Sequence, residues 1–391
     1  MLQRRQLLKG LAAATAATAM AGGVPRWARA AVNKDARFLI VIPAFGGAQI
    51  IDSVLPIRAS EAGSQASMID CFPDAEVMSL AGSPIRAVNA TMDHIVAQQL
   101  GTSFTVPLSP FIDKHKTQMM VTTLTGSSVN HAVAQHRSLT GGGAWKGRTL
   151  QECVAMAYGK DYPLPNVNMS RMGYLQPGDD PTIPSRVRAE PILQPLVKPL
   201  SFSASKGLRR GGADVPAQSL IDQARKLRDD ELDPESSFYQ TFRLSERIKL
   251  WMRQRSIDAP AIEKQQLIDK LFFVPEIADI LPLSDYGLVS SEDALLLAEV
   301  FPDMFAEDPD PLEQQAALAY LLIKNHASVT VTLSPTFAPV LGGPFGIKTV
   351  PLAFDGSHQD HRAAQALMWF QMLSIVDRLV DLLRGAVFNP E

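Results

Sequence analysis

The stretch TGSSVNHAVAQHRSLTGGG, residues 125–143, combines serine, asparagine and histidine and ends in glycines. A serine at the start of a helix is well placed to act as a nucleophile, because free backbone N–H groups and the helix dipole stabilise an anion there. Ser127 and Ser128 are the two candidates. Serine is also a common N-cap residue, so a capped helix without any chemistry explains the same pattern.

His131 and His136 belong to this stretch and lie five positions apart. On a regular helix they would be separated by about 140°, so one face cannot present both. Helical metal ligands are usually spaced at i and i+4, as in zinc proteases. At most one of the two histidines points at a common site, and we expect His131, nearer the helix start, to orient an anionic substrate.

A second cluster, FDGSHQDH, occupies residues 354–361 and offers two carboxylates and two imidazoles, namely Asp355, His358, Asp360 and His361. The two histidines are at i and i+3, about 60° apart on a helix, so both can face one point. Aspartate and histidine together suit zinc or a similar divalent ion. The alternative is a polar helix entrance, with Asp355 or Ser357 as cap and solvated histidines.

Asp52 is a third candidate, in the segment FGGAQIIDS. This segment follows the apolar run RFLIVIPAF, residues 37–45, which is typical of a buried strand in a parallel sheet. Because α/β folds place their sites beyond the C-terminal ends of parallel strands, Asp52 is a candidate metal ligand.

Two further strands are predicted at residues 117–124 and 328–334. Helices are predicted at four ranges: 129–138, 291–301, 311–327 and 356–385. Alternating strands and helices predict an α/β fold, a three-layer sandwich with a mostly parallel sheet. We expect the strands at 37–45 and 117–124 to be interior and neighbouring, bringing Asp52 and Ser127 to the same edge of the sheet.

The last predicted helix has the clearest periodicity. Its apolar positions recur at helical spacing along one face, at Met368, Met372, Ile375, Val376, Leu379 and Leu383. Ser357 with Asp360 fits a capping box at its start, and Gly385 fits a C-cap. We therefore expect this face to be buried.

The middle of the chain differs in composition. Residues 161–214 are rich in proline and glycine and predict loops with short strands, whereas residues 216–270 predict exposed helices. We interpret the range of about 161–270 as an insertion on one α/β domain that spans residues 36–391.

Residues 1–30 have the features of an export signal. The pair Arg4 and Arg5 precedes a short apolar run, and Ala28 and Ala30 form an A-x-A cleavage site. The paired arginines favour the twin-arginine translocase as the partner during export, with an ordinary secretory signal as the alternative. The run is too short to span a bilayer, so we expect a periplasmic or secreted protein with no transmembrane anchor after signal removal.

Composition and charge exclude several functional classes. The 391 residues are 46% hydrophobic and 20% charged, enough to bury a large core. Removing the five basic residues of the signal from 37 leaves 32 against 40 acidic residues, a net charge of −8. Such a surface repels nucleic acid and anionic lipid. Cys71 and Cys153 lack metal-site spacing but could form one disulfide after export.

Three of these stretches together resemble the exported bacterial family designated domain of unknown function 1501, which is placed in the alkaline phosphatase and sulfatase superfamily. GGAQIIDSVLP is similar to the family's Gly-Gly-Pro-Ser-His-Ile-Asp-Thr-Phe-Asp-Pro segment, and Asp52 matches its aspartate. NHAVAQHRSLTG is similar to its Asn-His-Gly-Pro-Ala-x-His-x-x-Leu-Thr-Gly segment, with His131 matching directly and His136 after a one-residue shift. FDGSHQDH stands where the family has Gly-Trp-Asp-Thr-His, matching Asp355 and, with one insertion, His358.

The resemblance implies a metal-dependent hydrolase acting on a small-molecule phosphate or sulfate ester. Asp52, Asp355 and His358, with His361, would bind zinc, or else calcium or manganese, and Ser127 or Ser128 would attack. Family members continue beyond this last helix with a Glu-Phe-Gly-Arg-Thr strand and an Asp-His pair, whereas this sequence ends at Glu391. We therefore expect at most one weakly bound metal. The alternative is a non-catalytic periplasmic protein that binds or assembles an envelope component through a degenerate site.

Overall fold

The computed structural model describes residues 37–44, 48–92, 104–122, 128, 130–170, 177–192, 223, 240, 270–273, 290–306, 310–334 and 361–387. Several predictions lie outside these residues. They concern the export signal at 1–30, the helices predicted at 216–270 apart from three single positions, the capping box at Ser357, and the site residues Ser127, Asp355 and His358.

The described part of the chain forms a mixed α/β structure around a small parallel sheet. The strands run in the order β1-β7-β5-β6 and are β1 Leu39–Val41, β7 Thr330–Thr332, β5 Asn166–Asn168 and β6 Glu190–Pro191. Leu39 pairs with Thr330, and Asn166 pairs with the same threonine from the other side. The expected strands at 37–45 and 328–334 are thus confirmed, and β7 lies between β1 and β5.

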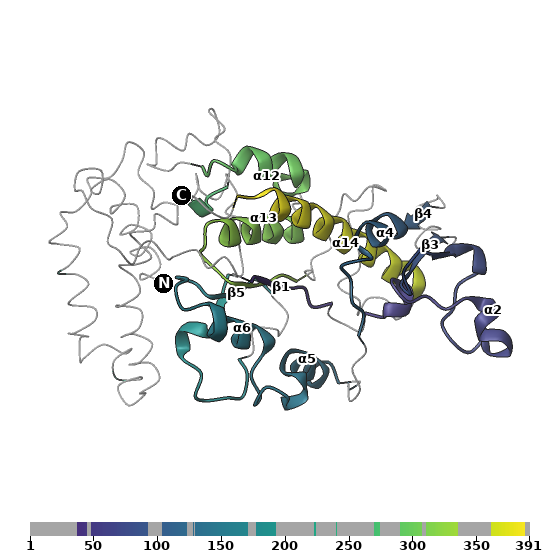
Figure 1. Ribbon diagram of the computed structural model, residues 1–391, viewed down its shortest axis with the longest axis horizontal. Coiled ribbons are helices and arrows are strands. Elements are labelled where there is room, and N and C mark those ends of the chain that lie inside the picture. The colour runs from purple at the N-terminus through teal and green to yellow at the C-terminus, as the bar shows by residue number, and fades with distance from the viewer. Residues whose placement is uncertain are drawn as a thin grey trace.

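The two faces of this sheet differ in chemistry. Val167 and Val331 point into an apolar core shared with helix α13, Pro311–Lys324. On the other face, Asn166 and Thr330 are hydrogen-bonded to one another, and Thr332 is bonded to helix α6, Leu150–Tyr158. Figure 1 shows α13 on one side of β1 and β5 and α6 on the other. The face of the sheet toward α13 therefore packs through apolar side chains, and the face toward α6 carries hydrogen-bonded polar side chains.

Three helices after residue 290 build the apolar side, and all three were predicted. They are α12 Ala294–Val300, α13, and α14 His361–Gly385. Asp310 caps α13 by accepting hydrogen bonds from the amides of Leu312 and Glu313. None of the helices in the described ranges has the length and apolar content that a bilayer crossing requires.

Helix α14 buries the face that the periodicity predicted. Met368, Met372, Ile375 and Leu379 are buried, and Val376 and Leu383 are partly buried against the same core. Trp369 contacts both this core and a second one under an antiparallel sheet. Helix α14 therefore joins two cores, and Gly385 is its last residue rather than a residue beyond it.

The antiparallel sheet was not predicted. Its order is β2-β3-β4, with β2 Val77–Ser79, β3 Arg86–Met92 and β4 Phe104–Pro107. Helix α4, Ser109–His115, follows it and is fastened to α14, because His115 Nε2 lies 2.7 Å from an Asp377 carboxylate oxygen. Figure 1 shows this sheet and α4 beside α14.

The predicted strand at residues 117–124 is wrong over the part that the structure describes. Residues 116–118 form a turn and 119–122 belong to no strand, so β1 has β7 as its partner rather than this segment. Met119 and Val121 pack against the second core while Met120 is exposed. The apolar side chains that suggested a strand are thus accommodated by packing alone.

The two cysteines are both free thiols, so the possible disulfide between Cys71 and Cys153 is absent.

Candidate functional site

Asp52 lies beyond the C-terminal end of β1, in a 3-10 turn, η2, Ile50–Asp52, and is fully buried. The segment that carries it is fastened to α14 through Gln49. The backbone amide of Gln49 donates to Gln365 Oε1 at 3.1 Å. The Trp369 ring N–H donates to the backbone carbonyl of Gln49, also at 3.1 Å. The loop after the first strand is therefore held against the early turns of the last helix.

His361 is the first residue of α14, one helical turn before Gln365. The structure thus brings together the Asp52 segment and the helix on which the sequence places His361. Asp355 and His358 precede that helix and lie outside the described residues. Among the side chains that are described, no three His, Cys, Asp or Glu residues are gathered as metal ligands.

Helix α5 is His131–Thr140, starting two residues later than expected. Its N-cap is Asn130, whose side chain accepts a hydrogen bond from the Val133 amide at 3.2 Å, so Ser128 does not have this role. The amide oxygen of asparagine caps as well as a serine hydroxyl does. Ser128 is partly buried just before the helix, and its hydroxyl oxygen accepts from the Asn130 amide at 3.1 Å.

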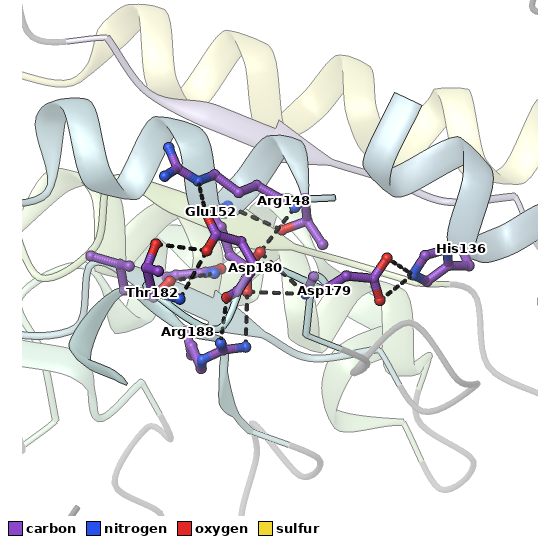
Figure 2. A network of polar contacts seen from close by, with 11 residues as sticks. His136, Arg148, Glu152, Asp179, Asp180, Thr182 and Arg188 are labelled. Carbon is purple, nitrogen blue, oxygen red and sulfur yellow. Dashed lines mark hydrogen bonds and ion pairs between the residues drawn. The ribbon is translucent and has the colours of Figure 1, made fainter. Parts of the chain in front are cut away.

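His136 contacts the segment 177–192. Its Nε2 atom lies 3.3 Å from the Asp179 carboxylate, at the right of Figure 2. This pair ties α5 to the segment 177–192. His136 is therefore a link between two elements, and His131, whose backbone begins the helix, remains the candidate nearer Ser128.

The Glu152 carboxylate, in the first turn of α6, has several buried polar partners. It is 1% exposed and forms a capping box with Thr149, accepting from the Thr149 amide at 2.9 Å. It also accepts from the Gly178 amide at 3.2 Å, and Arg188 lies 3.6 Å away. Figure 2 shows Glu152 within this network, with Arg188 beside it. Glu152 thus fixes the helix start and the turn at Gly178 to one another.

Asp180 is the second carboxylate of this network. Hydrogen bonds from the Thr182 hydroxyl and amide, together with one from Arg148 at 2.7 Å, lower its pKa to about 2. Arg188 donates to the Asp180 carbonyl at 2.9 Å. A carboxyl group with this pKa is ionised at neutral pH and is a poor proton donor there, so its role is to hold the loop.

Two glycines permit this arrangement. Gly147 has φ +73°, and a Cβ added to Gly178 would lie 2.4 Å from the Gly147 carbonyl oxygen and 2.5 Å from a Glu152 carboxylate oxygen. The Asp179 amide donates to the Gly147 carbonyl at 2.7 Å. The two backbone segments cross closely, which only residues without side chains allow.

Sequence reasoning did not identify this network. One signal was readable, because Thr149 and Glu152 have the T-x-x-E spacing of a capping box. Nothing in the local sequence pairs Arg148 with Asp180 or His136 with Asp179, since these contacts join segments that only the tertiary fold brings together.

A small pocket opens beside this network, against strand β5, and has room for about one water molecule. It is lined by Leu139, Thr149, Gln151, Glu152, Asn166, Asn168, Pro177 and Ala189. Gln151 donates to the hydroxyl of Thr332, the last residue of β7, at 3.2 Å. The start of α6 therefore lies at the sheet edge where α/β proteins place their sites.

No family model matches the chain, and neither a curated protein nor a solved structure matches it. The resemblance to an exported phosphatase-like family therefore depends on the three sequence motifs.

Proposed function

We propose that this chain is an exported, metal-dependent hydrolase-like protein with an alkaline phosphatase-like three-layer fold, acting on phosphate or sulfate esters. The observation that carries the proposal is the fastening of the Asp52 segment to α14 through Gln49, Gln365 and Trp369. It joins the first of the three motifs to the helix whose first residue, His361, is the last residue of the third. Helices on both sides of a parallel sheet are in keeping with the fold.

The residues present suit a divalent ion. Asp52 is fully buried beyond the end of β1, and its carboxylate is an oxygen ligand of the kind that divalent ions accept. With Asp355, His358 and His361 it offers the mixed oxygen and nitrogen ligands that zinc prefers, and manganese or calcium is the alternative. When bound, the ion would polarise the ester and stabilise negative charge on it.

The chain's own side chains would do the remaining work. Ser128, or Ser127 beside it, would supply the attacking hydroxyl, and His131 at the start of α5 would orient the anionic ester. The free amides at a helix start attract an anion of this kind. Glu152 and Asp180 would keep α5 and α6 in place without touching the ester.

The test measures bound zinc, manganese and calcium, and the hydrolysis of aryl phosphate and aryl sulfate, in the natively exported protein. Asp52→Asn and Asp355→Ala should each lower metal content and turnover by at least about tenfold. Asp113→Asn, at an exposed position of α4, is the matched control and should change neither.

Because Asp52 is buried, its variant needs a circular dichroism spectrum that matches the wild type. Asp355→Ala gives an independent reading if the first variant does not fold. Metal without turnover would overturn the hydrolase assignment in favour of a non-catalytic binding or assembly protein. Absence of both metal and turnover would overturn the metal site as well.

A further inference from the structure

Two buried glutamines, one on each side of the parallel sheet, hydrogen-bond to the end of strand β7 and the residues just after it. Gln315 of α13 has both amide atoms engaged, since Nε2 donates to the Ser334 carbonyl at 2.9 Å and Oε1 accepts from the Ser334 amide at 2.7 Å. Gln151 of α6 approaches the same strand end at Thr332. The side-chain amide of Gln315 thus has both of its polar atoms hydrogen-bonded, whereas that of Gln151 does not.

Only one end of the Gln151 amide is engaged. Its Nε2 donates to the Thr332 hydroxyl, whereas its Oε1 has no hydrogen-bond partner in the structure as described. Gln151 is 4% exposed, so bulk water does not reach this oxygen. Buried polar side-chain atoms of folded proteins are nearly always paired, with protein groups or with an ordered water.

The unpaired oxygen belongs to a residue that lines the small pocket beside the start of α6. The pocket walls carry further polar groups, from Thr149, Glu152, Asn166 and Asn168. A buried water needs a cavity of about its own size and two to four polar partners. Both conditions are met here.

We propose that this pocket binds one ordered water molecule, which donates a hydrogen bond to Gln151 Oε1 and takes its other partners from the asparagine side chains of β5. Through this water, Gln151 at the start of α6 would be hydrogen-bonded to β5 as well as to β7. This inference does not depend on the proposed function, because it concerns only the packing of α6 on the sheet.

Other occupants fit the walls less well. A divalent cation requires several carboxylates or imidazoles, and the lining has only Glu152, which already accepts from two backbone amides and faces Arg188. An anion would be repelled by the same carboxylate. Any larger molecule exceeds the space available.

The test is a high-resolution crystal structure of the wild-type protein, with Gln151→Leu and Gln315→Leu as a matched pair. We expect one water within about 2.6–3.2 Å of the Gln151 amide oxygen. The density should be lost in Gln151→Leu and kept in Gln315→Leu, whose glutamine needs no water. An empty pocket in the wild type, or an atom at the shorter distances of about 2.0–2.4 Å that metals show, would overturn the proposal.

A solution measurement covers the case in which a variant does not crystallise. In the wild type, the Gln151 side-chain amide protons should show a nuclear Overhauser effect to a water molecule with a long residence time. The Gln315 side-chain protons should show none. An effect of equal size at both glutamines, or at neither, would count against a specific water at Gln151.

Discussion

Gln365 on α14 accepts a hydrogen bond from the backbone amide of Gln49, 316 positions earlier in the chain, at 3.1 Å. Both the acceptor and the turn that follows Gln49 lie in the interior, since Gln365 and Asp52 are each 0% exposed. One side chain thus holds the start of the last helix to the loop after the first strand.

Replacing Gln365 with leucine should lower the free energy of unfolding by about 1–3 kcal/mol, because the Gln49 amide loses its acceptor in a buried place. Gln365→Glu keeps an acceptor oxygen and should cost less at a pH low enough to keep this buried carboxyl group protonated. Urea unfolding measures both. Equal loss in the two variants would show that the hydrogen bond is not the stabilising feature, and that packing of the side chain is.

The second prediction concerns Glu313, which is buried at the start of α13. Burial raises its pKa to about 7, although Arg378 of α14 lies 2.7 Å away and accounts for the largest opposing effect. A carboxyl group with a raised pKa stabilises the fold while it is protonated. Its contribution is therefore complete below pH 4.5 and is lost as the pH rises through 7.

Glu313→Gln should flatten the fall in stability between pH 4.5 and 7, which in the wild type amounts to about 3 kcal/mol at most. The measurement is chemical unfolding at a series of pH values. Glu299→Gln, at an exposed position of α12, is the control and should keep the wild-type profile. A profile unchanged by Glu313→Gln would show that this carboxyl is ionised throughout the range.

The third prediction concerns Asp180, whose pKa is lowered to about 2 by bonds from Thr182 and Arg148. The sign is opposite to that of Glu313. Stability from this group is present above the ordinary aspartate pKa and is lost as the pH falls toward 2. Asp180→Asn should make acid unfolding between pH 4 and 2 less steep, as followed by circular dichroism.

Thr182→Val is the companion variant, because it removes one of the bonds that lower the Asp180 pKa but keeps the carboxylate. Its acid transition should begin at a higher pH than that of the wild type. The hypothesis fails if both variants unfold along the wild-type curve.

The fourth prediction concerns the close crossing at Gly178. An alanine there would place its Cβ 2.4 Å from a carbonyl oxygen and 2.5 Å from the Glu152 carboxylate, so the two segments must separate. Gly178→Ala should cost about 2–3 kcal/mol. Gly142→Ala, where φ is +65° but no atom lies within 4 Å of the added Cβ, should cost only about 1 kcal/mol. Thermal unfolding of both variants checks the order.

The elements that could be predicted from the sequence are those in which apolar residues recur with one clear period. Helix α14 buries apolar residues at every expected turn, and α13 is capped by Asp310 with Pro311 at its first position. These signals are local and depend little on what lies opposite. Strand β7 could be predicted equally well from sequence, because the run around Val331 is short, rich in β-branched residues and preceded by a helix.

The elements that were missed, or that were predicted only as short strands without a position within residues 161–214, depend on distant partners. Strand β5 has the sequence Asn-Val-Asn and lies inside the parallel sheet, although only its valine is apolar. Its asparagines are stable there because one bonds Thr330 and the Val187 carbonyl, while the other bonds the Ser170 amide. The prediction for residues 117–122 failed in the opposite way, because their apolar run suggested a strand and the structure has none there. For the candidate site, the sequence indicated Asp52 and the last helix but not Gln49, Gln365 or the Glu152 network that hold these parts in position.

The central place of β7 has a consequence for how the protein is made. Strands β1 and β5 hydrogen-bond to β7 and not to one another, and β7 is the last of the described strands to leave the ribosome. Until residue 332 has been synthesised, the first strand waits with both edges open, and such edges invite pairing with other chains. Contacts so distant in sequence also form slowly. A ribosome stalled in the middle of this message would therefore release a product in which β1 and β5 lack their common partner, and we expect it to aggregate rather than fold partially.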